Sequence, residues 1–288
     1  MYVCTTSTAR QSGHNILPEA ELVVGVTSLP GVIFVLRLKE RDQVEVYDVN
    51  TYNLRKCLTV PNARSFIDMT SCECKECVYI ADHVGMCIHK VNSQDQFTRW
   101  PVSEVNDARD EPRGLSVNKA HNVLVTCPAA RKIKEFSSDG TIVREITLPD
   151  EVVNPLHAIQ LTSGQFKQFI VCHGEIDDPV NRVCIITENG SHIVHSHGGQ
   201  PGSDVEQYRG PRHLAVDNGF VFVADINNRR VTLLSSTLDY IGQFVTDDQF
   251  KGDPQRLHVD KQKRLLYVAD DELTDGKYTA GRVLVFSI

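Results

Sequence analysis

The chain has 288 residues, of which 41% are hydrophobic and 23% are charged, and its 18 Gly and 12 Pro residues are scattered along it. This composition excludes a disordered or collagen-like chain, and the longest apolar run, Val32 to Leu36, is far shorter than the ~20 residues that cross a bilayer. The net charge of −7 disfavours nucleic-acid binding through overall charge, although a local basic patch would still allow it.

The N-terminus and the cysteines indicate a compartment. Residues Met1 to Gln11 show no basic stretch followed by an apolar one, so we expect a cytoplasmic protein without a secretory signal and without contact with a membrane. The nine cysteines are odd in number and lie mostly in apolar, strand-like runs. This pattern favours reduced, buried thiols over a disulfide framework.

A short pattern recurs six times: two or three β-forming residues, a small residue and a polar one. Its clearest copies are VYIAD ending at Asp82, VFVAD ending at Asp225 and LYVAD ending at Asp270. Weaker copies end at Arg37, Cys127 and His173, and the spacing between copies is 45 to 52 residues. The constant spacing predicts one structural unit repeated along the whole chain.

Each copy lies inside a larger frame of alternating segments. The strand-like segment before it is opened in four units by a proline, which suits the first residue of a strand: Pro112, Pro155, Pro211 and Pro254. A third alternating run follows each copy, as in Arg230 to Leu234, and a fourth follows in most units, as in Tyr240 to Val245. Each unit therefore predicts four short antiparallel strands.

Six such units of ~45 residues, with no helical periodicity between them, predict an all-β, six-bladed β-propeller that forms a single domain over residues 1–288. We expect the blades at residues 20–60, 61–105, 111–150, 154–200, 210–247 and 253–288. The last unit ends after its third strand, so we expect the N-terminal segment (residues 2–8), with Val3 to Thr8 as the donor strand, to complete that blade. Pairing the two chain ends would close the ring and leave no long free edge.

The fifth unit, from Gly210 to Phe244, resembles the NHL repeat. The matching residues are Pro211, Asp217, Phe222, Ala224, Asp225, Asn228 and Arg230. The sixth unit keeps Asp260, Tyr267, Ala269, Asp270 and Arg282, and the third keeps Pro112, Gly114 and Lys132. The resemblance implies the propeller found at the C-terminus of tripartite-motif (TRIM-NHL) ubiquitin ligases and Brat-like translational repressors. It therefore implies an interaction scaffold and, in a ligase, only the targeting piece.

The aspartates that end the second strands, Asp82, Asp225 and Asp270, have two interpretations. They could hold a metal or catalyse hydrolysis on a shared face. The structural interpretation is stronger, because Arg230 follows Asp225 by five residues and similar basic residues recur at Lys132, Arg182 and Arg282. The family resemblance implies that such pairs are struts between blades, which fix register more than they add stability.

Basic and imidazole side chains gather near the proline-opened loops. We predict a binding surface there, formed by Arg113, His157, Arg209, Arg212, His213 and Arg256. Because equivalent loops lie on one face of a propeller, these side chains would converge around the central channel and suit an acidic peptide, a phosphate or single-stranded RNA. The alternative is an ordinary rim of solvated arginines.

Two metal hypotheses can be tested on the residues. An amidating lyase whose propeller resembles NHL repeats binds zinc through a histidine directly after the blade-opening proline, but Arg113, Leu156, Arg212 and Gln255 stand at those positions here. We therefore expect no cofactor. Cys72, Cys74, Cys77 and Cys87 follow a C-x-C-x2-C-x9-C spacing, for which a reduced loop cluster and a zinc site both remain open.

Taken together, these patterns predict a monomeric, non-catalytic scaffold that binds a protein or peptide partner through loops on one propeller face. Two alternatives remain. One is single-stranded RNA binding by the basic loops, and the other is a metal-dependent hydrolase or lyase at the mouth of the channel.

Overall fold

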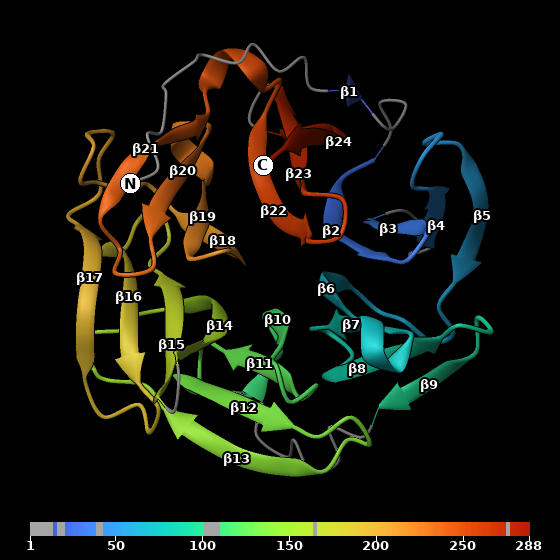
Figure 1. Ribbon diagram of the computed structural model, residues 1–288, viewed down its shortest axis with the longest axis horizontal. Helices are drawn as coiled ribbons and strands as arrows, with labels where there is room; N and C mark the ends of the chain where they lie inside the picture. The colour runs from blue at the N-terminus through green and yellow to red at the C-terminus, as the bar shows by residue number, and fades with distance from the viewer. Residues whose placement is uncertain (1–13, 16–20, 39–42, 101–109, 164–165, 275–276) are drawn as a thin grey trace.

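The computed structural model describes residues 14–15, 21–38, 43–100, 110–163, 166–274 and 277–288. Six small sheets surround a central axis, and in each one the strands follow one another from the axis to the rim (Figure 1). The predicted all-β, six-bladed propeller is confirmed. Only short 3-10 turns interrupt the strands of the described residues, and none of their helices is long and apolar enough to cross a membrane.

The first three blades follow the predicted order of four antiparallel strands. Blade one consists of β2 (Val23–Leu29), β3 (Val32–Arg37), β4 (Gln43–Asp48) and β5 (Leu54–Thr59). Blade two consists of β6 (Phe66–Cys72), β7 (Cys77–Asp82), β8 (Cys87–Asn92) and β9 (Phe97–Trp100). Blade three consists of β10 (Gly114–Val117), β11 (Val123–Cys127), β12 (Lys132–Phe136) and β13 (Ile142–Thr147).

The remaining blades complete the ring. Blade four consists of β14 (Pro155–Ser163), β15 (Phe166–His173), β16 (Asn181–Thr187) and β17 (Ile193–Gly199). Blade five consists of β18 (Pro211–Asp217), β19 (Phe220–Asp225), β20 (Arg230–Ser235) and β21 (Tyr240–Val245). Blade six consists of β22 (Asp253–Asp260), β23 (Leu265–Thr274) and β24 (Lys277–Ser287).

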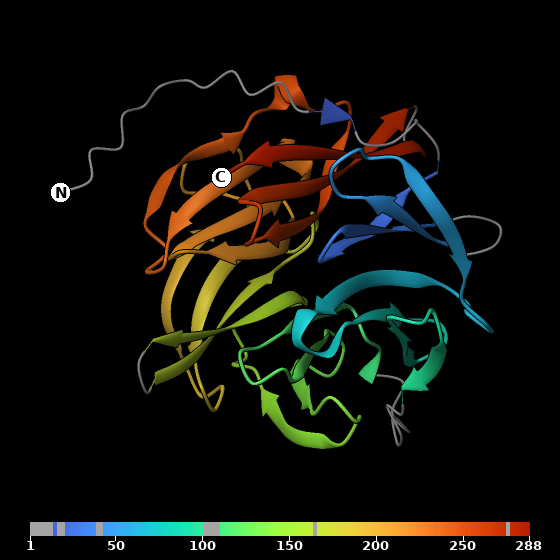
Figure 2. The same cartoon turned by 45° about the vertical axis from the view of Figure 1, so that its right-hand side comes forward.

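The N-terminal segment supplies a short outer strand to blade six. The two-residue strand β1 (His14–Asn15) pairs with β24, with His14 opposite Val285, and Figure 2 shows it beside the last blade. The two ends of the chain thus meet in one sheet, as ring closure requires. The predicted donor, Val3 to Thr8, lies outside the described residues.

The apolar side chains explain why the blades stack. The second strand of blade two is buried at all six positions, because it has a neighbouring blade on each face, whereas four of the six residues of the outer strand β13 are exposed. The buried apolar residues of the described chain form six clusters, and each cluster joins two adjacent blades. The core is therefore a ring of six inter-blade layers.

The innermost strands share a local irregularity. In five blades the pairing between the first and second strands shifts by one residue near the start of the first strand. A bulge of this kind changes the direction of the side chain that follows it. The residues directly after the shift are Gly25, Asp68, His157, His213 and Arg256.

Candidate functional site

The bulged positions bring four polar side chains together at the axis. Asp68 of blade two contacts His213 of blade five, and blades two and five lie opposite each other in the ring. Asp68 also contacts Arg256 of blade six, and the rings of His157 and His213 stack with centroids 3.8 Å apart. Side chains of opposite blades can meet only at the centre, so these four residues form an axial cluster.

Hydrogen bonds fix the axial cluster. Asp68 Oδ1 lies 3.2 Å from Arg256 Nε and 3.5 Å from His213 Nε2, and its Oδ2 accepts the backbone N–H of Leu115 at 2.7 Å. His157 Nε2 lies 3.0 Å from the Leu115 carbonyl oxygen, to which it donates. The Arg256 guanidinium also donates to the carbonyl of the residue before Asp68. The cluster is thus held by both side-chain and backbone partners.

Burial decides the charges of the axial cluster. Burial and the proximity of His213 lower the pKa of His157 to about 3, so His157 is neutral at neutral pH. Burial raises the pKa of Asp68, but His213 and Arg256 lower it more, and the net value is about 2. Burial also lowers the pKa of His213, so at neutral pH Asp68 is ionised beside two neutral imidazoles, and Arg256 supplies the balancing charge.

The predicted binding surface divides into an inner and an outer part. His157, His213 and Arg256 converge at the axis, as expected, but they are only 2%, 6% and 5% exposed and form no open binding surface. Arg212 is the extra residue of the bulge that precedes His213, which separates the two side chains. Arg113 and Arg212 are half-buried and Arg209 is exposed. The binding role of these six residues stays a prediction.

One face of the propeller carries all the loops that lead into the innermost strands. In a sheet of antiparallel strands in sequence order, these loops and the loops between the second and third strands lie on the same side. We call this side the loop face, and the opposite side the turn face. In the described chain, the loop face consists of residues 21–22, 38, 60–65, 83–86, 110–113, 128–131, 148–154, 174–180, 200–210, 226–229 and 246–252.

Three arginines of the loop face are paired with carboxylates from other loops. Arg113 lies 3.3 Å from Glu175. Two further pairs join neighbouring loops: Arg131 with Asp150 at 2.7 Å, and Arg229 with Asp247 at 3.0 Å. Among the described residues of this face, nine carboxylate residues are exposed, whereas only three basic residues are. The described loop face therefore carries more exposed acidic than basic side chains, and of the predicted binding residues Arg113 is ion-paired on it.

Three axial side chains are of the types that bind metals, but the guanidinium of Arg256 beside them disfavours a bound cation. Ligand atoms of Asp68, His157 and His213 lie within 4.8 Å of one another. Arg256 is bonded to the same Asp68 oxygen that His213 approaches, so a cation there would meet a positive charge at short range. The cluster is also enclosed, which leaves a substrate no access to it.

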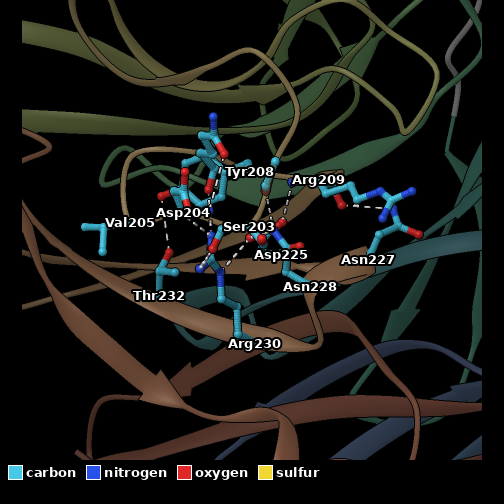
Figure 3. A network of polar contacts seen from close by, with 12 residues as sticks. Ser203, Asp204, Val205, Tyr208, Arg209, Asp225, Asn227, Asn228, Arg230 and Thr232 are labelled. Carbon is cyan, nitrogen blue, oxygen red and sulfur yellow. Dashed lines mark hydrogen bonds and ion pairs between the residues drawn. The ribbon is translucent and has the colours of Figure 1, made fainter.

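The strut interpretation of the aspartate column agrees with the geometry in blades five and six. Arg230 Nε lies 2.8 Å from Asp225 Oδ2, and both side chains are buried (Figure 3). Arg230 also donates to the carbonyls of Ser203, Asp204 and Gln207, while Asp225 accepts the Arg209 N–H. The loop 200–210 between blades four and five is thus fastened to blade five.

Blade six repeats this arrangement. Arg282 Nε lies 2.6 Å from Asp270 Oδ2, and Asp270 accepts the backbone N–H groups of Lys251 and Gly252. Arg282 donates to the Gln249 carbonyl in the same loop. The two other predicted partners differ, because Arg182 faces His173 and Lys132 faces Cys127 in the strand register.

Blade two replaces the arginine of this strut with two other residues. Cys87 faces Asp82 in the register, where Arg230 faces Asp225, and His89 follows two residues later. His89 Nε2 lies 3.3 Å from Asp82 Oδ2 and 3.6 Å from Cys87 Sγ, and all three side chains are buried. Burial lowers the pKa of His89, but hydrogen bonds to Asp82 and Cys87 raise it more, to about 9.

The cysteine spacing does not correspond to one site. Cys72 and Cys77 are register partners at the turn between β6 and β7, Cys74 is exposed in that turn, and Cys87 lies at the other end of β7. No disulfide joins these four cysteines, and they do not form one loop cluster. Sequence analysis missed Asp68 and His89. The available signal for Asp68 was a lone charge in an apolar strand.

Comparisons with known proteins address the fold. No family model matches the chain, and no curated protein sequence matches it. A streptogramin B lyase structure superposes with a TM-score of 0.60 at 14% identity, covering 95% of this chain and 97% of that one. The hydrazine synthase of Kuenenia stuttgartiensis superposes with a TM-score of 0.62 at 12% identity, covering 100% of this chain and 99% of that one. A structure of a nidogen–laminin complex superposes with a TM-score of 0.62 at 11% identity, covering 83% of this chain and 85% of that one.

These likenesses support the propeller fold alone, because the identities are low. They include both enzymes and a component of a protein complex, so they do not decide between a catalytic and a binding role. The resemblance to NHL repeats stays a prediction from the residues of blades three, five and six.

Proposed function

We propose that the chain is a non-catalytic interaction module whose loop face binds a protein or peptide segment. The observation that carries the proposal is a set of exposed aliphatic side chains on fastened loops of that face. Val84, Ile176 and Val205 are 50%, 42% and 50% exposed, and they lie in three different loops. Exposed apolar side chains held among polar ones are the usual anchors of a protein interface.

The way the loops are held supports binding at low entropic cost. Val205 belongs to the loop that Arg230 fastens through three carbonyls. The loop 174–180 that carries Ile176 is held by Asn181 Nδ2, which donates to the carbonyls of Glu175 and Asp178. Loops that are already ordered lose little conformational entropy when a partner binds.

The charge of the loop face indicates the chemistry of the partner. Its exposed carboxylates outnumber its exposed basic residues, and Arg113, Arg131 and Arg229 are already ion-paired. A segment with apolar and basic side chains would suit this surface better than an acidic peptide, a phosphate or RNA. The NHL resemblance and the propeller of the nidogen–laminin complex support an interaction role in general terms.

A random peptide library displayed on phage provides the test. Peptides selected on the wild-type chain would be measured against an Ile176→Ser/Val205→Ser variant and against Phe220→Ser, a control on the turn face whose side chain is 43% exposed. We expect the double variant to weaken binding by at least about tenfold, and the control to leave it unchanged. Failure to select any peptide, or equal binding by the double variant, would refute the proposal.

The same measurement separates the RNA alternative. A single-stranded oligouridine should not bind at physiological salt if the loop face recognises peptides. Binding that weakens steeply with added salt and requires Arg209 and Arg212 would instead favour RNA.

A further inference from the structure

We propose that blade two contains a zinc site formed by Asp82, Cys87 and His89. Their carboxylate oxygen, thiol sulfur and imidazole nitrogen lie within 4.8 Å of one another. Sulfur, nitrogen and oxygen donors in a compact set are the ligands that zinc prefers in proteins. The inference concerns metal binding and does not depend on the function of the loop face.

Two of the three ligand separations match tetrahedral zinc. Bond lengths of about 2.3 Å to sulfur, 2.0–2.1 Å to nitrogen and 2.0–2.2 Å to oxygen, at tetrahedral angles of about 109°, separate sulfur and nitrogen by about 3.6 Å and nitrogen and oxygen by about 3.3–3.4 Å. The observed separations are 3.6 Å from Cys87 Sγ to His89 Nε2 and 3.3 Å from His89 Nε2 to Asp82 Oδ2. The sulfur of Cys87 and the oxygen of Asp82 both lie near the same imidazole nitrogen, as ligands of one ion do. In a catalytic triad, by contrast, they would approach opposite ring nitrogens.

The surroundings orient the ligands as the second shell of a metal site does. Asp82 accepts three backbone N–H groups, from Arg64 at 2.9 Å, Ser65 at 3.0 Å and Gly85 at 2.7 Å. Hydrogen bonds of this kind hold a ligating carboxylate in place. A zinc ion bound to one thiolate and one carboxylate would also be electrically neutral, which suits a buried position.

The comparison between blades supplies the second, independent reason. In blades five and six a guanidinium lies against the equivalent aspartate, 2.8 Å and 2.6 Å away. In blade two the register partner is the short Cys87, and the side chain that meets Asp82 is the imidazole of His89, which can pair with the carboxylate as a cation or, once deprotonated, share a metal ion with it. A metal cation coordinated by Asp82, Cys87 and His89 would then take the place of the imidazole proton, beside the loop that contains Arg64 and Ser65.

The test uses the full chain with zinc and with cobalt as a spectroscopic probe. The wild type should retain one zinc per chain after gel filtration, and cobalt should give a thiolate charge-transfer band. Cys87→Ser should abolish the band and weaken zinc binding at least about tenfold in competition with a chromophoric chelator. Cys74→Ser and Cys72→Ser, which change cysteines at the other end of β7, should retain both.

A second variant keeps the test decisive if Cys87→Ser does not fold. Cys87→Arg/His89→Thr transfers to blade two the pair that blade five has as Arg230 and Thr232, so it should fold and bind no zinc. A wild type that takes up no zinc would overturn the proposal. So would zinc binding that survives in both Cys87 variants, or that is lost in Cys74→Ser or Cys72→Ser.

Discussion

Replacing His157 with glutamine should change how the stability of the chain depends on pH. His157 is 2% exposed, and burial lowers its folded-state pKa to about 3, whereas an unfolded histidine titrates near 6.5. Between these values the unfolded chain binds a proton that the folded chain does not bind. The contribution of His157 to stability is therefore fully present above about pH 6.5 and is lost as the pH falls toward 3.

The magnitude follows from the two pKa values. At pH 5.0 the wild type should lose about 2 kcal/mol of unfolding free energy through His157 relative to pH 7.5. Other groups also titrate in this range, and Asp271, whose pKa burial raises to about 7, acts in the opposite direction. The decisive quantity is therefore the difference between variant and wild type, in which these other groups cancel.

Urea denaturation followed by far-UV circular dichroism at both pH values measures this difference. His157→Gln keeps an N–H donor for the Leu115 carbonyl but should be less stable than the wild type at pH 7.5, since it loses the stacking on His213. Its deficit should shrink by about 2 kcal/mol at pH 5.0. His192→Gln, on the exposed surface, should show no such change. A deficit that is the same at both pH values would mean that His157 is protonated inside the folded axis, and the closed axis would then be wrong.

Three further substitutions test the fold by the same denaturation assay at pH 7.5. Arg230→Met should cost about 3–5 kcal/mol because it leaves Asp225 buried without its partner, whereas a loss below about 1 kcal/mol would contradict the strut. Gly114→Ala should cost about 1–3 kcal/mol, since an added Cβ would lie 2.4 Å from the Leu156 carbonyl oxygen; a neutral result would show that the two innermost strands can separate freely. Tyr208→Phe should cost about 1 kcal/mol through its hydrogen bond to Thr232, and an unchanged midpoint would argue against that bond.

The propeller could be predicted because its signal is local. The second strand of each blade is buried on both faces, so it reads as a short apolar run wherever it occurs, and ~45 residues return the chain to the same place in the next blade. The four-strand pattern of a blade is kept even where single residues differ: Phe66 begins the first strand of blade two, where a proline begins that of blade five.

The site could not be predicted in the same way, because a one-residue bulge reverses the side to which a side chain points. Arg212 and His213 are neighbours in the sequence, yet one is half-exposed and the other lies at the axis. The pairing of Arg113 with Glu175 joins residues 62 positions apart. Such contacts depend on the closed ring and leave no trace in a repeat unit.

The cysteine spacing wrongly suggested that Cys72, Cys74, Cys77 and Cys87 form one site, for a related reason. Cys77 and Cys87 are close in sequence, but Cys87 lies opposite Asp82 at the far end of a six-residue strand, about 17 Å along it from Cys77. The informative spacing was the five residues from Asp82 to Cys87, which equals the five from Asp225 to Arg230.

The degenerate blades show that one structural task has several chemical solutions. In blade four His173 stands where Asp225 stands in blade five, and Arg182 faces it. The neighbouring Asn181 holds other loops with its amide: its Nδ2 donates to two carbonyls of loop 174–180, and its Oδ1 accepts the Gly210 N–H at 2.6 Å. Loops of the same face are thus fastened near the start of the third strand by an Asp–Arg pair in blades five and six and by an amide in blade four. The residue types differ while the blades keep their geometry, so the repeat fades in the sequence.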